Sequence, residues 1–169
     1  MIHINIGSNL NSIYGSKFKN ISITVKLLQE LRLKIIKISN YYETPSYPNK
    51  NLPKFVNVGL FVDYGKNYLS LIKEISLIEK KIGRIKTKKN EPRVCDIDII
   101  DYKGLKIKDE SLILPHPRCH NRNFVLYPIK EIDPEWIHPI YKKNVDFLID
   151  KLNYNSRIEI TRLRKSVII

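Results

Sequence analysis

The sequence has no long apolar run and no segment typical of export, and both absences exclude a class of protein. No stretch approaches the roughly 18–20 unbroken apolar residues of a membrane-spanning helix. The N-terminus, MIHINIGSN, lacks the basic and apolar regions that make up a secretory signal. We therefore expect a cytoplasmic protein with no membrane partner.

Cysteine is scarce, with two residues in a chain of 169. Cys95 and Cys119 lack the spacing of zinc ligands, and a chain of this length needs no disulfide to hold its core. Both are predicted to be free thiols.

The glycine-rich sequences that commonly bind nucleotides are also missing. The chain contains neither G-x-x-x-x-G-K-[ST] nor G-x-G-x-x-G, so neither a P-loop nor a Rossmann site is supported. It has no internal repeat, low-complexity stretch or linker. We expect one domain over residues 1–169, of which 140–169 is the part that the sequence explains least.

Acidic residues are outnumbered by basic ones, 17 against 30, which gives a formal net charge of +13. A basic chain suits an anionic partner such as a nucleic acid, a membrane surface or a phosphate-bearing ligand. Lys, Ile and Asn are abundant throughout, as a drift in composition would produce. The charge therefore indicates a phosphate ligand only where it clusters.

Hydrophobic periodicity predicts alternating strands and helices. The predicted strands are 2–6, 33–43, 54–64 and 95–102, and the predicted helices are 16–31, 68–82 and, shorter, 124–132 and 145–153. Residues 44–53 are a proline-rich loop, 83–94 a polar loop after the helix stop at Gly83, and 112–123 irregular. The order βαββαβ predicts a ferredoxin-like α+β fold, a mainly antiparallel sheet with helices on one face and additional C-terminal elements. The end, RLRKSVII, fits either a frayed tail or a final strand.

Two acids stand out in the strand predicted at 95–102. Side chains alternate along a strand, so Asp96 and Asp98 point to the same face, about 7 Å apart, while Ile97 points to the other. Two adjacent carboxylates repel each other, and magnesium is typically held by one or two carboxylates plus substrate phosphates. The pair is a candidate metal site, although a solvent-facing sheet edge also tolerates two acids.

Basic residues flank this pair on both sides. They are Arg84, Lys86, Lys88, Lys89 and Arg93 before it, and His116, Arg118, His120 and Arg122 after it. Around a polyphosphate, such cations would neutralise the charge that develops in phosphoryl transfer. A solvated charge run is the plainer interpretation of the loop alone.

Aromatic and amide side chains form a third candidate group. Phe55 and Asn57 share one face of a predicted strand, and Phe124 follows the basic segment. Two aromatic rings can clamp a flat heterocycle, while an Asn amide can donate to and accept from its edge. Taken alone, both phenylalanines are better explained by ordinary burial in the core.

Taken together and in order, these segments resemble the 6-hydroxymethyl-7,8-dihydropterin pyrophosphokinases of folate biosynthesis. The resemblance runs from the N-terminus to about Pro139. Its motifs are I-G-S-N-L at 6–10, Y-x-T-P at 42–45, F-V-N at 55–57, I-E-x-x-x-G-R at 78–84, P-R-x-x-D-I-D-I-I at 92–100, P-H-P-R-x-H-x-R-x-F-V-L at 115–126 and P-I-x-E-I-x-P-x-W-x-H-P at 128–139.

The resemblance implies a reaction and a set of roles. Diphosphate would pass from ATP, the co-substrate, to the pterin hydroxyl, and AMP would leave. The catalytic residues would be Arg84, Arg93, Asp96 and Asp98, with Asp96 and Asp98 binding two Mg²⁺ ions. The ATP-binding residues would be Glu79, Arg84, Lys86, Arg93, His116 and Arg122. The pterin-binding residues would be Thr44, Pro45, Phe55, Asn57 and Phe124.

The sequence departs from the family pattern in three places. Lys86 stands where a second Arg is common, Asn90-Glu91 replace a Trp in a loop about one residue shorter, and Tyr47-Pro48 replace small residues of the pterin loop. We expect loop 83–94 to close over ATP, and the chain to act as a monomer without nucleic acid. The alternatives are a basic RNA-binding module, for which the RNP1 pattern is missing, and an inactive scaffold of the same fold.

Overall fold

A computed structural model describes residues 1–85, 91–109 and 112–168. Its centre is an antiparallel sheet in the order β5-β1-β4-β3-β8, with β2 also paired to β4. These strands are β1 (Ile2–Ser8), β2 (Lys34–Ile38), β3 (Tyr42–Thr44), β4 (Phe55–Asp63), β5 (Asp96–Tyr102) and β8 (Thr161–Arg162). The order and the antiparallel pairing confirm the predicted ferredoxin-like arrangement.

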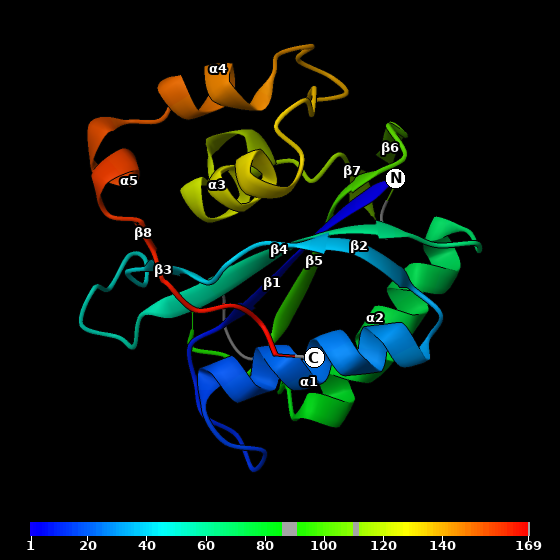
Figure 1. Cartoon of the computed structure of the whole chain (residues 1–169), viewed down its shortest axis with the longest axis vertical. Coiled ribbons are helices and arrows are strands. Elements are labelled where there is room, and N and C mark those ends of the chain that lie inside the picture. The colour runs from blue at the N-terminus through cyan, green and yellow to red at the C-terminus, as the bar shows by residue number, and fades with distance from the viewer. Residues whose placement is uncertain (86–90, 110–111, 169) are drawn as a thin grey trace.

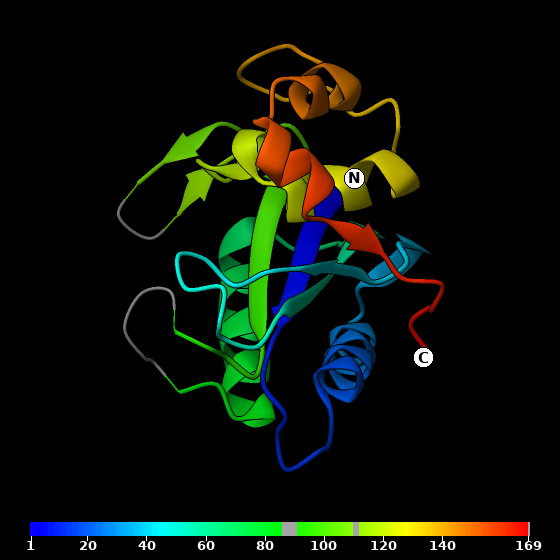
Figure 2. The same cartoon turned by 90° about the vertical axis from the view of Figure 1, so that its left-hand side faces the viewer.

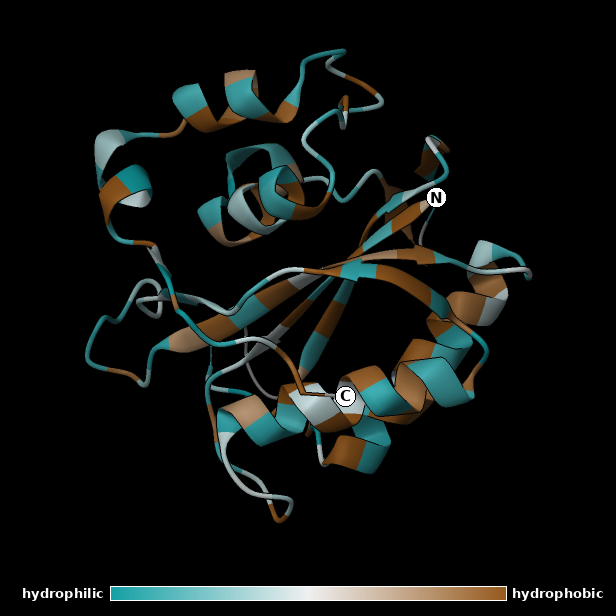
Figure 3. Cartoon of the chain, viewed as in Figure 1, coloured by the Kyte–Doolittle hydropathy of each residue, from teal (hydrophilic) through white to brown (hydrophobic). Residues whose placement is uncertain are grey.

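Helices α1 (Lys17–Glu30) and α2 (Tyr68–Ile82) lie against one face of the sheet (Figure 1). Their amphipathic character is visible as alternating apolar and polar segments in Figure 3. Side chains of Ser16 and Asn67 cap the helix starts, and Gly83 ends α2 with a left-handed φ of 96°. These helices and the apolar side of the sheet enclose the larger core. The bounds predicted for both helices are confirmed to within a residue or two.

The opposite face is covered as well, which the prediction of helices on one face missed. Helix α3 (Asn123–Ile132) lies over β4, and α4 (Val145–Asp150) packs on α3 (Figures 1 and 2). A second core joins these helices to Ile100 of β5 and to Trp136. A bulge in β5, opposite His3 and Ile4, lets Ile100 turn toward this side.

Several local predictions were wrong in detail. The strand expected at 33–43 is broken into β2 and β3, because Ser39 bonds to the backbone of Gly59 through its own N–H and its hydroxyl. The segment 112–123, expected to be irregular, contains strand β7 (Ile113–Leu114), which pairs with β6 (Ile107–Lys108), and a 3₁₀ turn at Cys119–Asn121. The helix expected at 145–153 ends at Asp150.

The C-terminal end matches neither alternative fully, because only Arg162 of the segment RLRKSVII belongs to a strand and the described residues after it are irregular. Helix α5 (Tyr154–Ile158) leads into β8, which pairs with β3, and Leu163 and Val167 pack against the larger core. Cys95 and Cys119 are buried free thiols, as predicted. Within the described residues, no helix is both long and apolar enough to cross a bilayer.

Candidate active site on the polar face of the sheet

A row of aligned residues crosses the sheet on the face that α3 partly covers. Asp96 of β5 lies opposite Gly7 of β1, Gly7 lies opposite Asn57 of β4, and Asn57 lies opposite Tyr42 of β3. The next row on the same face aligns Asp98 with Asn5. The alternation predicted from the sequence therefore holds: Ile97 and Ile99 enter the larger core, and the two acids point away from it.

Asp96 is held by two arginines. Its Oδ1 lies 2.7 Å from Arg84 Nη2, and its Oδ2 lies 2.6 Å from Arg93 Nη1. Arg84 also forms an ion pair with Glu79, whose Oε1 accepts a 2.8 Å hydrogen bond from the backbone N–H of Ile97. Burial lowers the pKa of Arg84, but Asp96 and Glu79 together outweigh it and raise the pKa overall.

Asp98 faces the second basic segment. Its Oδ2 lies 3.5 Å from Arg122 Nη1 and 3.9 Å from His116 Nε2. Burial, followed by repulsion from Asp96, raises the pKa of Asp98 to about 6. Burial, followed by the positive charges of Arg122 and Arg118, lowers the pKa of His116 to about 4. His116 is therefore neutral at pH 7. A further cation placed beside Asp98 would stabilise its ionised carboxylate.

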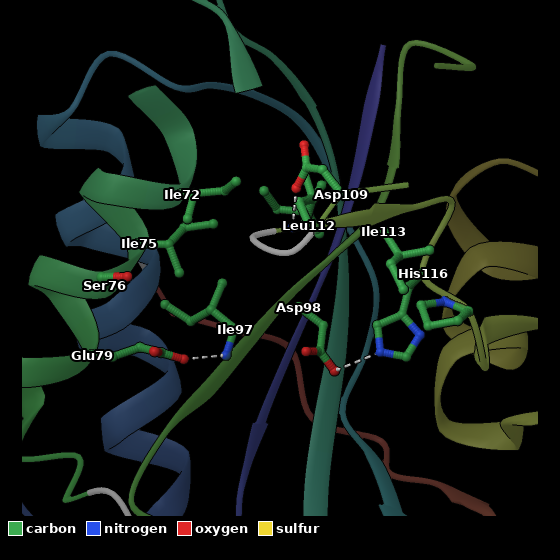
Figure 4. Close-up of a pocket in the computed structure, with 12 residues that line it drawn as sticks. Ile72, Ile75, Ser76, Glu79, Ile97, Asp98, Asp109, Leu112, Ile113 and His116 are labelled. Carbon is green, nitrogen blue, oxygen red and sulfur yellow. Dashed lines mark hydrogen bonds and ion pairs between the residues drawn. The ribbon is translucent and has the colours of Figure 1, made fainter. Parts of the chain in front are cut away.

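A pocket of about 390 Å³ opens beside the free edge of β5, between α2 and the β6–β7 hairpin (Figure 4). Glu79, Asp98 and His116 supply polar groups to its wall. Its apolar wall includes Ile72, Ile75, Ile97, Ile99, Leu112 and Ile113. The pocket thus joins an apolar hollow to Asp98, one of the two acids.

Three of the predicted pterin residues lie on the same face, two or three strands away from the acids. Thr44 of β3 lies opposite Phe55 of β4, and Asn57 is two residues further along β4. Asn57 accepts a hydrogen bond from Asn5, but its own Nδ2 is buried with no partner among the described residues. A buried donor left unpaired costs about 1–3 kcal/mol, so this amide is suited to a ligand with an acceptor.

Phe124 and Pro45 complete the predicted pterin set from two further elements. Phe124 stands in the first turn of α3 with the guanidinium of Arg122 over its ring, 5.3 Å from the centroid. Pro45 directly follows β3 and begins the loop to β4. Lys86, the remaining predicted ATP contact, lies outside the described residues, as do residues 87–90 of the loop that we expect to close over ATP.

Asn9 is a connecting residue that the sequence did not single out. Its Nδ2 donates to the Pro53 carbonyl at 3.0 Å and to Ser46 Oγ at 3.3 Å, at the two ends of the β3–β4 loop. Its Oδ1 accepts from the backbone N–H of Arg93 at 2.7 Å. Asn9 therefore links the arginine beside Asp96 to the predicted pterin loop. The motif I-G-S-N-L at 6–10 contains Asn9, but the Gly-Ser-Asn sequence by itself indicates only a turn and gives Asn9 no role.

Comparison with known proteins decides the family. A model of the 7,8-dihydro-6-hydroxymethylpterin-pyrophosphokinase (HPPK) family matches residues 3–134. The chain belongs to this family. A 2-amino-4-hydroxy-6-hydroxymethyldihydropteridine pyrophosphokinase of Aquifex aeolicus is 36% identical over 142 residues, which cover 84% of this chain and 86% of that protein. The predicted resemblance to this family is thereby confirmed.

Larger relatives contain the same region as one part. The folic acid synthesis protein fol1 of Pneumocystis carinii is 34% identical over 151 residues, which cover 89% of this chain but 20% of that protein. The solved wild-type HPPK-DHPS of Plasmodium falciparum matches with a TM-score of 0.69 at 17% identity, over 99% of this chain and 49% of that one. The chain thus spans about a fifth to a half of these relatives, and the structural match confirms the fold. None of these matches supports the RNA-binding alternative.

Proposed function

We propose that the chain transfers diphosphate from ATP to the hydroxyl of 6-hydroxymethyl-7,8-dihydropterin, releasing AMP and the pterin diphosphate in folate biosynthesis. One observation carries the proposal: Asp96 and Asn57 are aligned through Gly7 on the same face of the sheet. Two strand spacings separate them by about 10 Å. A flat ring at Asn57 can therefore present a hydroxymethyl group to phosphates held at the acids.

The pocket beside β5 is suited to the nucleotide. Its apolar wall can take the flat base, and its polar end is formed by Asp98, one of the two acids, and by His116 (Figure 4). Arg84, Arg93, His116 and Arg122 would then surround the triphosphate, and Glu79 would contact the nucleotide. We extend this role to Lys86, for which the sequence is the only basis.

The donor set fits magnesium that arrives with the nucleotide. Among the described residues no group of three or more His, Cys, Asp and Glu could hold a metal on its own, whereas magnesium is ordinarily held by one or two carboxylates plus substrate phosphates. We assign Asp96 and Asp98 as ligands of two Mg²⁺ ions. Bound there, the ions would supply charge neutralisation and activate the attacking hydroxyl.

Charge balance supports this assignment. Arg84, Arg93 and Arg122 offset the three carboxylates of Glu79, Asp96 and Asp98, with His116 neutral. ATP with about four negative charges and two divalent cations adds no net charge to that set. Metal binding at Asp96 requires Arg84 and Arg93 to leave its oxygens, and the phosphates offer them an equivalent partner.

The pterin would lie over β4, with its edge at Asn57 and Thr44 and its ring between Phe55 and Phe124. The unpaired Nδ2 of Asn57 supplies a donor that a ring acceptor can use. Pro45 begins the loop on the far side. No covalent enzyme intermediate is needed, because the pterin oxygen attacks the β-phosphorus in line while the chain positions both substrates.

The direct test measures AMP from ATP and Mg²⁺ with and without the hydroxymethyl dihydropterin. We expect AMP and pterin diphosphate in equal amounts, and no AMP without the pterin. AMP formation at the same rate with and without the pterin would reject the proposal. No AMP in the presence of both substrates would also reject it and would favour an inactive scaffold. We also infer that residues 1–169 act as one catalytic unit. That the protein is monomeric and cytoplasmic stays a prediction as well.

A further inference from the structure

Residues beyond the family match contact one side of the active site. The match ends at residue 134, whereas residues 153–163, which comprise α5, β8 and their flanks, return to the sheet beside β3. We call this segment the C-terminal strap. Figures 1 and 2 show it at the end of the sheet where α3, β3 and the loop 45–54 meet.

The strap is tied first to the start of α3. Asn123 Nδ2 donates a 2.6 Å hydrogen bond to the backbone carbonyl of Ser156 in α5. The other end of the same amide, Oδ1, accepts from the backbone N–H of Phe124 at 2.6 Å. One side chain thus joins the strap to the residue that we assign to the pterin ring.

The second tie is to β3. Strand β8 pairs with it, aligning Arg162 with Tyr42. Arg162 also donates to both oxygens of Glu131 in α3, at 3.1 and 3.3 Å, and Glu131 accepts from the Tyr42 hydroxyl at 2.7 Å. Strand β3 ends two residues later at Thr44.

The third tie is to the loop between β3 and β4. Lys50, in that loop, forms an ion pair with Glu159 of the strap. The Lys50 side chain is 59% exposed, so this pair contributes little by itself. The pair matters for position, because it joins the strap to a third element around the predicted pterin position.

The nucleotide side has no such tie. Among the described residues, the hydrogen bonds and ion pairs of Arg84, Arg93, Asp96 and Asp98 go to β5, α2, Glu91, the turn at Asn9 and the basic segment. None of them goes to the strap. An effect of the strap on binding should therefore fall on one substrate.

We propose that the C-terminal strap is a positioning element for the pterin subsite, holding Phe124, Thr44 and the 45–54 loop in the arrangement that binds the ring. The proposal rests on the proposed function. Preorganised partners bind more tightly because less ordering is left to the binding step. Loosening the strap should weaken pterin binding and leave ATP binding unchanged.

The test uses the full chain with Asn123→Asp and Arg162→Ala combined. Asp at position 123 keeps the acceptor for the Phe124 N–H and replaces the donor to Ser156 with a carboxylate oxygen, which repels the Ser156 carbonyl. The matched control combines Lys66→Ala and Lys130→Ala, which remove two surface ion pairs away from the strap. Arg162→Lys, which keeps a charge beside Glu131, serves as the conservative variant.

We expect the pterin Kd to rise about tenfold in the strap variant, with the Kd of a non-hydrolysable ATP analogue within twofold of wild type. Arg162→Lys should bind pterin more tightly than Arg162→Ala, and the control should match wild type. Equal weakening for both substrates, or an unchanged pterin Kd, would overturn the proposal. If the double variant does not fold, Arg162→Ala alone decides by the same comparison of the pterin Kd with the Kd of the ATP analogue. Pterin-dependent AMP formation by wild type tests the proposed function separately.

Discussion

Replacing Gly7 with alanine tests the placement of the pterin at Asn57. A Cβ at position 7 would lie 2.8 Å from Asn57 Oδ1, closer than real Cβ atoms approach, and 3.8 Å from Phe55 Cδ1. The amide must therefore move, although its Oδ1 already accepts from Asn5 at 3.3 Å. Overpacking of this kind typically costs about 1–3 kcal/mol.

Part of that cost should appear in pterin binding, because the displaced amide is the group assigned to the ring. A loss of about 1.4 kcal/mol corresponds to a tenfold increase in Kd. We expect a pterin Kd raised about tenfold for Gly7→Ala, with the Kd of an ATP analogue within twofold of wild type. Fluorescence or calorimetric titration of each ligand measures both.

Gly59→Ala provides a matched control on the same face of the sheet. Its Cβ would also meet an atom at 2.8 Å, but that atom is Pro128 Cβ of α3. It should lower the free energy of unfolding by a similar amount, about 1–3 kcal/mol, while the pterin Kd changes less than for Gly7→Ala. Equal pterin binding by the two variants would refute the assignment of Asn57.

Four further predictions follow from the site and its surroundings. Asp96→Ala and Asp98→Ala should each abolish AMP release while circular dichroism shows an intact fold; near-normal release by either would reject its metal role. Arg93→Ala should lower kcat more than it raises the KM for ATP, because its charge matters most as negative charge develops, and the reverse split would contradict this. Asn9→Ala, which leaves the Arg93 N–H without its acceptor, should lower the free energy of unfolding by about 1–3 kcal/mol in urea titration, and an unchanged value would refute the link. Burial, followed by the charge of His120, lowers the pKa of His138 to about 4, so the free energy of unfolding should fall as the pH drops from 6.5 toward 4. His138→Gln should make the free energy of unfolding depend less on pH over that range, and an unchanged dependence would contradict this.

Local periodicity was sufficient to predict those features that depend only on neighbouring residues in the sequence. The two-residue repeat of a strand placed Asp96 and Asp98 on one face, and Phe55 and Asn57 on another strand's matching face. Helix α2 was predicted with its end at Gly83, because an apolar face and a glycine stop are both local signals.

Contacts between distant segments were not readable in the same way. The break between β2 and β3 depends on Ser39 bonding to Gly59, and the neighbouring Asn40 is held by Glu131, 91 residues away. Asn9 looks like any turn residue until Arg93 and Pro53 are placed beside it. The strap consists of a five-residue helix and a two-residue strand, too short for periodicity to identify.

The central claim is that Asp96 and Asp98 hold the metal-bound phosphates of ATP. Isothermal titration with a non-hydrolysable ATP analogue, with and without Mg²⁺, tests it on the wild type and on the double variant Asp96→Asn, Asp98→Asn. We predict binding that strengthens at least tenfold with Mg²⁺ in wild type and gains nothing from Mg²⁺ in the variant. The same gain in both proteins would show that the metal is held elsewhere.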